Sequence, residues 1–510
     1  MRKWIFITLL FPVFYATGQP GFNKTYGFEQ EQITGSAFAN VLLDNDTLVL
    51  FGTCYPPVTP FGQQALLFVK MDTLGNVLSH KCHLDPDAPL DEYAAAPNYE
   101  LIKTSDGGYA MTGSNLATDY GLFIKLSYEG EIEFYRKYDS ELERDVRKVL
   151  ELNDGYFLSG WKQLQNYDTQ VFLMKVDKQG NFLWEKTYGQ PGVVDVMGSL
   201  VKVDDNHFAI GAAKSKGLGE PPYNATDTWT KSWLIQVDSL GNLLVSGESS
   251  MNAQAGIVGL NRMPDGWLYG TGTFELINQF QWGTKCKIVR TGENIDDILW
   301  ERVLSTTTIA GNSVVDIKLT PEGDWVAAGE WITPPPPPPT WGYQFLPSFT
   351  YKFTANNDSI WYRQDTIFWE SDTLCASPSY VGGLAVMPSG SIVVAGYTDR
   401  LCVLPERSYG WVLKISKDGC IDTLCVTTDV NIEPKLPEVI VYPNPTAGIL
   451  NIIGCDICEA ELYDMFGRLV QKQPLNNDFY DLSFLPDGAY WLKILNEDRI
   501  IKIKKIIKCR

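Results

Sequence analysis

Two of the three histidines in this chain, His80 and His83, lie in the one segment whose residue types resemble a metal site. The segment is His80-Lys81-Cys82-His83-Leu84-Asp85-Pro86-Asp87, and proteins bind zinc through imidazole, thiolate and carboxylate groups. His80 and Cys82 would share one face of a strand. The spacing nevertheless matches no standard zinc site, so we expect neither a metal ion nor a cofactor.

Motifs for nucleophilic, zinc or phosphate chemistry are missing from the sequence. It contains no His-Glu-x-x-His, no Gly-x-Ser-x-Gly and no phosphate-binding glycine loop. Acidic residues number 61 against 42 Lys and Arg, a net charge of −19. Carboxylates are therefore available for a glycosidase pair, but nothing selects one. The acidic balance argues against nucleic-acid binding, and an enzyme is the weaker hypothesis.

The first 18 residues have the order of a secretory signal. Arg2 and Lys3 precede the apolar stretch Trp4–Tyr15, and small residues follow at Ala16-Thr17-Gly18. The apolar stretch is shorter than the roughly 20 residues that span a bilayer. No later stretch is long enough, so we predict a mature chain from Gln19 without a transmembrane segment.

Export would permit disulfides among the ten cysteines. Cys420 could pair with Cys425 at the end of the last repeat described below, and Cys375 with Cys402 in neighbouring loops. Cys54 could pair with Cys82. In Cys455-x-x-Cys458 a hairpin bridge competes with free thiols. The sequence alone leaves these pairings open.

Seven internal repeats organise the middle of the chain. Each contains an apolar-x-apolar-x-Gly segment, and the glycines are Gly52, Gly113, Gly160, Gly211, Gly272, Gly329 and Gly396. A strand residue, usually Lys, then precedes a turn residue by five positions, in the pairs Lys70/Gly75, Lys125/Gly130, Lys175/Gly180, Gln236/Gly241, Lys287/Gly292, Lys352/Asn357 and Lys414/Gly419. Gly and Asn adopt left-handed backbone at low cost. The pattern predicts a tight hairpin in every repeat.

Each repeat resolves into four strands, which we name A to D. In the third repeat they cover about 147–152, 156–161, 170–177 and 181–188, and helical periodicity is absent. Four strands repeated seven times predict a β-propeller, with a β-solenoid as the alternative. Phe22–Gly27 copies the strand-D segment Trp184–Gly189. We expect this copy to supply the outer strand of the last blade and so close the ring.

Connections of variable length fall on one face of such a ring. The A–B and C–D turns are short, whereas the other loops vary, and long loops on a rigid scaffold often form binding surfaces. These loops are rich in aromatic residues, which offer a glycan or protein ligand rigid amphipathic area; alternatively they pack beneath the loops. The candidate ligand contacts are Trp161, Trp229, Trp282, Trp331, Trp341 and Tyr343.

The repeats resemble those of secreted bacterial propeller proteins, whose units read Asp-Gly-Gly-Tyr-x-x-x-Gly and Lys-x-Asp-x-x-Gly. The resemblance covers roughly Phe22–Cys425. It implies a fold and no particular reaction.

A different pattern begins after the polar linker 426–435. Short strands and turns over 436–510 predict a β-sandwich. Three blocks, Tyr442-Pro443-Asn444-Pro445-Thr446-x-Gly448, Leu462-Tyr463-Asp464-x-x-Gly467-Arg468 and Leu485-Pro-x-Gly488-x-Tyr490, resemble the type A C-terminal sorting domain of the type IX secretion system. The resemblance implies recognition by that machinery, passage through the periplasm and across the outer membrane, and removal of the domain by a sortase-like peptidase. An ordinary accessory immunoglobulin-like domain is the alternative.

Together these patterns predict an all-β protein. We expect a signal peptide at 1–18, a seven-bladed β-propeller at 19–425, a linker at 426–435 and a small immunoglobulin-like β-sandwich at 436–510. The predicted protein is secreted or anchored at the outer-membrane surface, and it binds a glycan or a protein at the aromatic loop face in an adhesion role. The alternatives are a glycan hydrolase or lyase that uses carboxylates in the central funnel, and a structural component of a surface layer.

Overall fold

The computed structural model describes residues 21–509 outside the segments 29–32, 34, 57–63, 85–92, 95–98, 116–119, 139–142, 165–167, 191–193, 216–229, 254–255, 279–280, 308–312, 331–347, 366, 369–375, 378, 401–406, 422–439, 443, 454–457, 466–467, 476–478 and 497–498. The described residues form strands and turns and contain no helix, as expected of an all-β chain. Two compact units are present, Met1–Thr427 and Thr428–Arg510. The predicted signal and linker lie outside the described residues.

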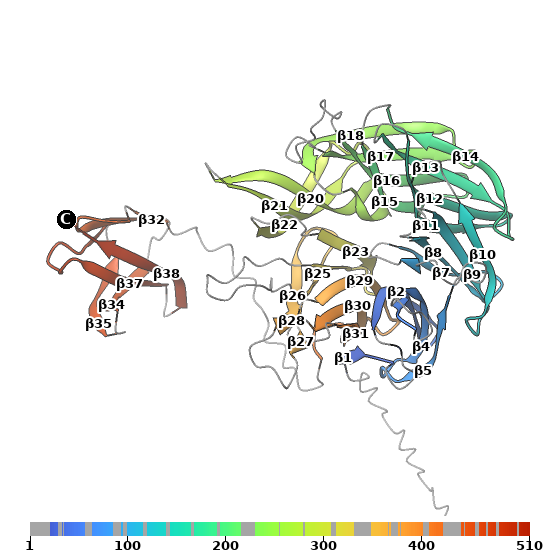
Figure 1. The fold of residues 1–510 in the computed structure, drawn as a ribbon. Helices are drawn as coiled ribbons and strands as arrows, with labels where there is room; N and C mark the ends of the chain where they lie inside the picture. The colour runs from blue at the N-terminus through green and yellow to red at the C-terminus, as the bar shows by residue number, and fades with distance from the viewer. Residues whose placement is uncertain are drawn as a thin grey trace, which may run out of the picture. The chain divides into compact units, whose positions relative to one another are not determined.

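The described part of the first unit forms seven antiparallel sheets that follow one another along the chain (Figure 1). We number them 1 to 7. Sheets 1 to 3 contain β2 Ser36–Asp44, β3 Thr47–Cys54, β4 Ala65–Asp72 and β5 Val77–His83; β6 Tyr93–Ala94, β7 Leu101–Lys103, β8 Tyr109–Asn115, β9 Gly121–Leu126 and β10 Ile132–Tyr138; and β11 Arg144–Leu152, β12 Gly155–Gln163, β13 Thr169–Val176 and β14 Phe182–Tyr188.

Sheets 4 to 6 repeat this meander. They contain β15 Asp195–Lys202, β16 His207–Ser215, β17 Thr230–Asp238 and β18 Leu243–Ala253; β19 Val258–Met263, β20 Gly266–Asn278, β21 Gln281–Thr291 and β22 Ile298–Thr307; and β23 Ser313–Leu319, β24 Trp325–Glu330, β25 Ser348–Phe353 and β26 Ser359–Asp365. A small ribbon of β27 Ile367–Phe368 and β28 Ala376–Ser377 precedes sheet 7.

Sheet 7 joins the two ends of the first unit. It consists of β29 Ser379–Val386, β30 Ile392–Arg400, β31 Arg407–Ile415 and, at its outer edge, the N-terminal strand β1 Phe22–Tyr26. β1 pairs antiparallel with β31, from Phe22 opposite Lys414 to Tyr26 opposite Gly410. This confirms the predicted closing strand, which covers an edge that would otherwise be exposed.

The A strands lie innermost and close a ring. Each contacts the A strand of the next sheet, from β2 through β7, β11, β15, β19 and β23 to β29, and β29 contacts β2 again. A hydrophobic cluster fills the space between each pair of neighbouring sheets. Side chains of both faces of every sheet are thereby buried, which is why the B and C strands read as nearly continuous apolar runs. This is a β-propeller.

The C–D turns confirm the five-residue pattern in six repeats. Gly75, Gly130, Gly180, Gly241, Asn357 and Gly419 all have positive φ, between 72° and 83°. Gly292 is the exception, and the prediction for repeat 5 was wrong. The turn there is formed by Asn294–Asp297, where the Asp297 amide bonds the Asn294 carbonyl, because this repeat carries extra residues in the hairpin.

The outer rim is tied together through these turns. A side chain near the end of one outer strand donates to the carbonyl of the left-handed residue in the next sheet. The contacts are Tyr26–Gly75, His83–Gly130, Tyr138–Gly180, Tyr188–Gly241, Arg302–Asn357 and Arg363–Gly419. Between sheets 4 and 5 the buried Ile295 instead packs against Gly247, where an added Cβ would lie 3.2 Å from the Ile295 methyl.

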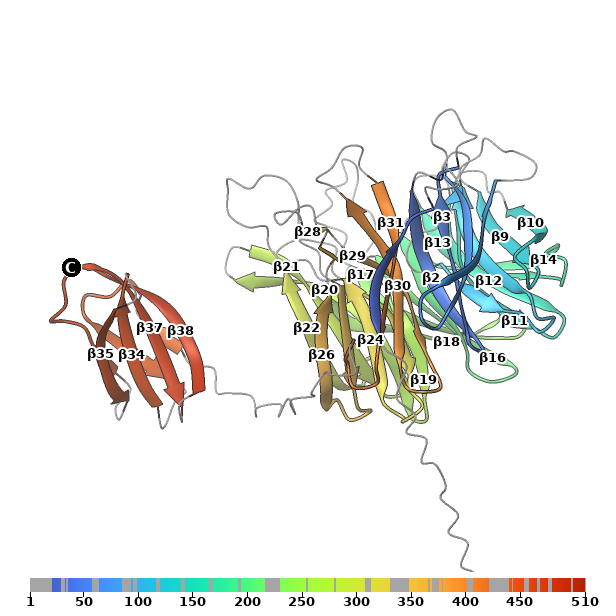
Figure 2. The same cartoon turned by 90° about the horizontal axis from the view of Figure 1, so that it is seen from below.

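The second unit is a sandwich of two small sheets. One contains β32 Ile440–Tyr442, β33 Ile449–Ile453 and β36 Phe479–Asp481. The other contains β34 Cys458–Asp464, β35 Leu469–Leu475, β37 Gly488–Asn496 and β38 Arg499–Lys508, and Figure 2 shows these four strands side by side. A single apolar core lies between them and includes Leu450, Leu462, Tyr480 and Leu492. The immunoglobulin-like β-sandwich is thus present as predicted.

Candidate functional site

A β-bulge interrupts the inner strand of six sheets at the same height. In sheets 1 and 3 the pairing register shifts between Phe38 and Asn40, and between Val146 and Lys148. The corresponding shifts in the other sheets fall at 197/199, 258/261, 314/316 and 381/383. Bulges redirect the side chains that follow them, so equivalent positions of each repeat face the axis of the ring.

The bulges explain the repeated glycine in the B strands of sheets 1, 3 and 7. A Cβ on Gly160 would lie 1.8 Å from the Asp145 carbonyl oxygen, and one on Gly52 equally close to that of Ala37. No side chain fits at that distance, because the bulged inner strand presses its backbone against the glycine. In repeat 5 the glycine opposite the bulge is Gly270, which faces Val258; the predicted Gly272 faces Cys286.

The residues after the bulges line an axial cavity of about 420 Å³, to which all seven inner strands contribute. Asn40, Lys148, Ser199, Asn261 and Asp316 occupy the post-bulge positions, and Glu100 joins them immediately before β7. Lys318, two residues beyond Asp316, lines the same cavity. We call these seven residues the polar ring. The sequence pattern located the glycines but not the ring, because a bulge leaves no separate mark in a single sequence.

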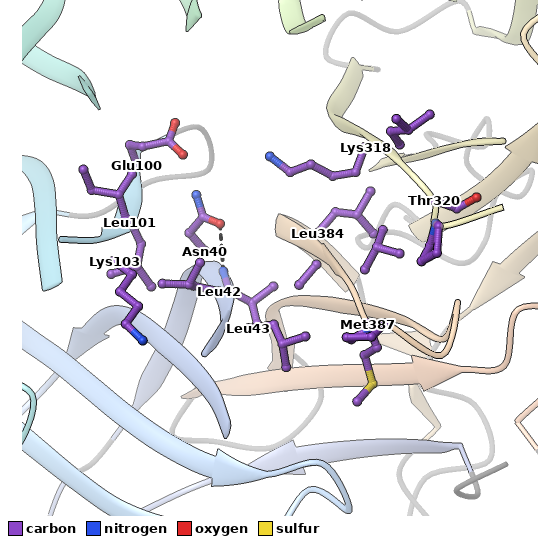
Figure 3. Close-up of a pocket in the computed structure, with 17 residues that line it drawn as sticks. Asn40, Leu42, Leu43, Glu100, Leu101, Lys103, Lys318, Thr320, Leu384 and Met387 are labelled. Atoms are coloured by element: carbon purple, nitrogen blue, oxygen red, sulfur yellow. Dashed lines mark hydrogen bonds between the residues drawn. The ribbon is translucent and has the colours of Figure 1, made fainter. Parts of the chain in front are cut away.

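A second cavity of about 760 Å³ continues from the ring toward the A–B turns. The two cavities share Asn40, Glu100, Ile102, Lys103 and Lys318. Further lining comes from Leu42, Leu43, Leu384 and Met387, and Figure 3 shows these side chains gathered below Lys318. Pro321 and Pro388 at its outer end belong to A–B turns. The cavity therefore meets the face of short turns, opposite the face of variable loops.

Two ion pairs stand in the polar ring. The Lys148 ammonium lies 3.0 Å from the Glu100 carboxylate, and Lys318 lies 3.2 Å from Asp316. Burial raises the pKa of Asp316, the charge of Glu100 raises it further, and Lys318 opposes both effects. Asp316 in turn raises the pKa of Lys318. Because the charge of Glu100 acts on Asp316, the two pairs share one electrostatic environment.

The ring amides are held by backbone groups. Asn40 donates to the Tyr99 carbonyl at 2.7 Å and accepts from the Val41 amide at 2.8 Å. Asn261 donates to the carbonyls of Gly259 and Ile317, at 2.7 and 3.1 Å. Both amide side chains thus link one sheet to the next. The charged side chains are the groups of the ring that can take part in binding or catalysis.

The aromatic candidates are only partly within the described residues. Trp161 lies in β12 and Trp282 in β21, so both occupy strands and not loops, which corrects their predicted location. Trp282 belongs to a long hairpin in which Asn278 pairs with Gln281, because the B and C strands of repeat 5 continue pairing instead of ending in a loop. Trp229, Trp331, Trp341 and Tyr343 lie outside the described residues.

The histidines and the cysteine of the metal-like segment have other partners, whereas Asp85 and Asp87 lie outside the described residues. Cys82 forms a disulfide with Cys54, as predicted. His83 contacts the Gly130 carbonyl at 2.8 Å, and the His80 ring packs at a tilt against Phe28 with ring centroids 4.4 Å apart. Within the described part of the chain, no cluster of three metal-ligating side chains occurs.

Two further cysteine predictions reach beyond the described residues. Cys420 is disulfide-bonded, but its predicted partner Cys425 is not described. Cys375 and Cys402 also lie outside the described residues, so their pairing stays a prediction.

The C-terminal blocks hold the last strand of the second unit in place. Asn444 donates to the Lys505 carbonyl and accepts from the Ile507 amide, both at 2.8 Å. Asp464 binds Arg468 across a tight turn at 2.7 Å, and the Tyr490 hydroxyl donates to the Pro486 carbonyl. Gly448 has φ of 153° and faces Ser483. Tyr442, Pro445, Tyr463 and Gly488 lie in the described parts of this unit, whereas Pro443 and Gly467 do not.

Comparison with known proteins identifies the second unit. Residues 440–509 match the family described as secretion system C-terminal sorting domain. The protein thus carries a type IX sorting domain, which marks it for export to the cell surface or the medium and implies interaction with the secretion machinery. The described residues contain no helix that could cross a membrane.

No match to a curated protein sequence was found. Among solved structures, extracellular domains 1–2 of Drosophila semaphorin 1a give a TM-score of 0.41 at 8% identity, over 78% of this chain and 88% of that one. The polysaccharide lyase Uly1 gives 0.41 at 10% identity, over 74% and 90%. A neuraminidase-like protein from A/bat/Guatemala/164/2009 gives 0.35 at 9% identity, over 65% and 88%.

Proposed function

We propose that this exported propeller is a surface binding protein, and that its ligand, a glycan or a protein, docks on the face of variable loops. The observation that supports this function is the asymmetry of the two faces. In the described residues the C–D turns of six sheets share one left-handed geometry. Apart from the longer C–D hairpin of repeat 5, the differences in loop length between repeats fall at the opposite ends of the strands, where a rigid ring can vary its loops without losing its core.

The proposed contacts are the six aromatic candidates named from the sequence. Trp282 sits one residue from the end of the β20–β21 hairpin, at the loop face. Trp161 is half-buried at the same end of β12. Within the described residues its indole N–H is buried without a hydrogen-bond partner, and a ligand oxygen could accept from it.

The axial cavity gives little support to the glycan hydrolase alternative. A glycosidase pair needs one carboxyl group that donates a proton and one that acts as nucleophile or base. The cavity is lined by Glu100, Glu151 and Asp316, but equally by Lys103, Lys148 and Lys318. Because each acid has a lysine partner, with Glu151 paired to Lys178, the cavity is not the acidic funnel that this alternative requires.

Export in this proposal follows the usual route of such domains. The signal at 1–18 directs the chain to the periplasm, and the second unit directs it through the outer membrane. A sortase-like peptidase then removes that unit, and the propeller is anchored at the surface or released.

Binding without turnover is the test of this function. The purified full chain is applied to arrays of glycans and of surface proteins, and the hits are incubated for product release. Trp161→Ala, Trp282→Ala and Trp341→Ala should each weaken binding to the best hit. Trp491→Ala is the matched control, because Trp491 is 47% exposed in the second unit. Product release from a polysaccharide, or binding that only the control variant weakens, would contradict the proposal.

A further inference from the structure

The polar ring presents charges of both signs on opposite sides of the axis. Glu100 and Lys148 come from sheets 2 and 3, whereas Asp316 and Lys318 come from sheet 6, across the ring in the order of the inner strands. The Lys148, Glu100 and Asp316 side chains are 13%, 24% and 17% exposed. They are partly desolvated, so a ligand charge of the wrong sign would be disfavoured here more strongly than at the protein surface.

The outer part of the cavity has a different character. Leu42, Leu43, Leu384 and Met387 line it between the ring and the A–B turns (Figure 3). Lys318 points from β23 into the space between the other ring residues and these apolar side chains. Apolar walls with a few convergent polar groups are typical of small-molecule sites, and the two cavity volumes fall in the range such sites have.

We propose that the axial cavity binds a small zwitterion with apolar side groups, of the size of an apolar dipeptide, which enters from the face of the A–B turns. Its ammonium group lies against the carboxylate of one ion pair and its carboxylate against the lysine of the opposite pair. Its apolar side groups occupy the outer cavity. A dipeptide fits better than a single amino acid, because the peptide unit separates the two charges and allows them to reach both sides of the ring.

Charge balance excludes simpler ligands from this proposal. An anion would approach Lys148 and Lys318 only beside Glu100 and Asp316, and a cation would meet the reverse arrangement. A neutral sugar could offer hydroxyl hydrogen bonds to these groups but no opposite charge to either pair. Only a ligand that carries both charges is complementary to both pairs. This site is on the face opposite the variable loops. The test of this proposal is therefore independent of the test of the proposed surface binding.

Calorimetric titration of the full chain with L-leucyl-L-leucine tests the ligand class. We expect saturable binding at micromolar to millimolar concentration. N-acetyl-leucyl-leucine lacks the ammonium group, leucyl-leucine amide lacks the carboxylate, and glycyl-glycine lacks the apolar side groups. Each should bind at least tenfold more weakly. Equal binding of the N-acetylated and free peptides, tighter binding of maltose, or no binding of leucyl-leucine at millimolar concentration would overturn the proposal.

Paired substitutions locate the site without leaving an isolated buried charge. Glu100→Gln with Lys148→Met, and Asp316→Asn with Lys318→Met, should each weaken leucyl-leucine binding at least tenfold. Lys214→Met with Glu248→Gln is the matched control, because this pair is separated by 2.5 Å but lines neither cavity. Thermal unfolding of each variant reports whether the ring is intact. Unchanged affinity in a folded ring variant, or an equal loss in the control, would overturn the assignment.

Discussion

The hydroxyl of Tyr188 donates a 2.8 Å hydrogen bond to the carbonyl of Gly241, 53 residues further along the chain. Tyr188 closes the outer strand of sheet 3, and Gly241 is the left-handed residue in the C–D turn of sheet 4. Tyr26 and Tyr138 make the same contact to Gly75 and Gly180. The tyrosine near the end of the outer strand and the turn glycine of the next repeat, which are far apart in the sequence, are therefore two halves of one contact between neighbouring sheets.

Removing that hydroxyl should weaken the ring measurably. Tyr188 is 8% exposed, so Tyr188→Phe leaves a carbonyl in a poorly hydrated place and should lower the free energy of unfolding by about 1 kcal/mol. Denaturant unfolding of the full chain, followed by tryptophan fluorescence, measures the change. Tyr362→Phe is the control, since that hydroxyl is on an exposed side chain, and it should change stability by less than about 0.5 kcal/mol. Equal effects would show that the rim contact adds nothing.

Alanine substitutions at Gly160 and Gly107 distinguish a glycine required for close packing from a glycine required for left-handed backbone. Gly160→Ala places a methyl group 1.8 Å from the Asp145 carbonyl oxygen. The inner strand must move, and we expect a loss of more than about 3 kcal/mol or failure to fold. Gly107 has φ of 89° with no atom within 4 Å of an added Cβ, so Gly107→Ala should cost only about 1 kcal/mol. Circular dichroism during urea unfolding distinguishes the two, and a Gly160→Ala protein of normal stability would refute the bulge argument.

The Cys54–Cys82 disulfide should stabilise sheet 1. It closes a loop between cysteines 28 positions apart, for which chain entropy predicts a stabilisation of about 3.5 kcal/mol. The double variant Cys54→Ala/Cys82→Ala should therefore unfold at a lower denaturant concentration than the parent. Adding a reducing agent should lower the parent's stability and leave that of the variant less affected. A parent insensitive to reduction would contradict this role.

Glu330 should make stability depend on pH. Burial raises the pKa of this carboxyl group to about 7, from 4.5 in an unfolded chain. Between these values the folded protein holds a proton that the unfolded chain has lost, so stability should fall as pH rises through this range. The loss should be complete about one pH unit above 7 and amount to at most about 3.5 kcal/mol. Glu330→Gln should remove the decline.

Unfolding curves at pH 5 and pH 8 measure this difference. The variant should be more stable than the parent at pH 8 and similar to it at pH 5. Glu293→Gln is a suitable control, because Arg262 lowers the pKa of that exposed carboxylate. Replacing Glu293 should therefore leave in place the decline in stability that Glu330 causes. The assignment would be contradicted if the stability of the parent rose between pH 5 and pH 8 and that of Glu330→Gln rose equally.

Sequence periodicity predicted the parts of the fold that depend on local rules. The turn residues Gly75 and Asn357 adopt left-handed backbone because their type permits it, and the closing strand at Phe22 is visible as a copy of another strand. The polar ring could not be predicted in this way. Asn40 and Asp316 both face the axis because a bulge shifts the register of each inner strand at the equivalent position. Such bulges depend on contacts between sheets. The turn of repeat 5 was predicted wrongly for a related reason. Gly292 follows the strand at the same five-residue spacing as in the other repeats, but extra residues in the hairpin move the turn to Asn294–Asp297.

The second unit should be required for passage across the outer membrane. Asn444 makes two hydrogen bonds to the final strand, through Lys505 and Ile507, so the sorting blocks keep the C-terminal end of the chain folded into the sandwich. A chain that ends at residue 427 should reach the periplasm of its native host and remain there, and cell fractionation with an antibody to the propeller would detect it. Asn444→Ala should reduce the surface-exposed fraction, because it frees the final strand from the blocks that hold it. Trp491→Ala, which alters an exposed side chain of the same unit, serves as the control and should leave export less affected. Surface display of the truncated chain at the level of the full chain would show that export depends on another signal.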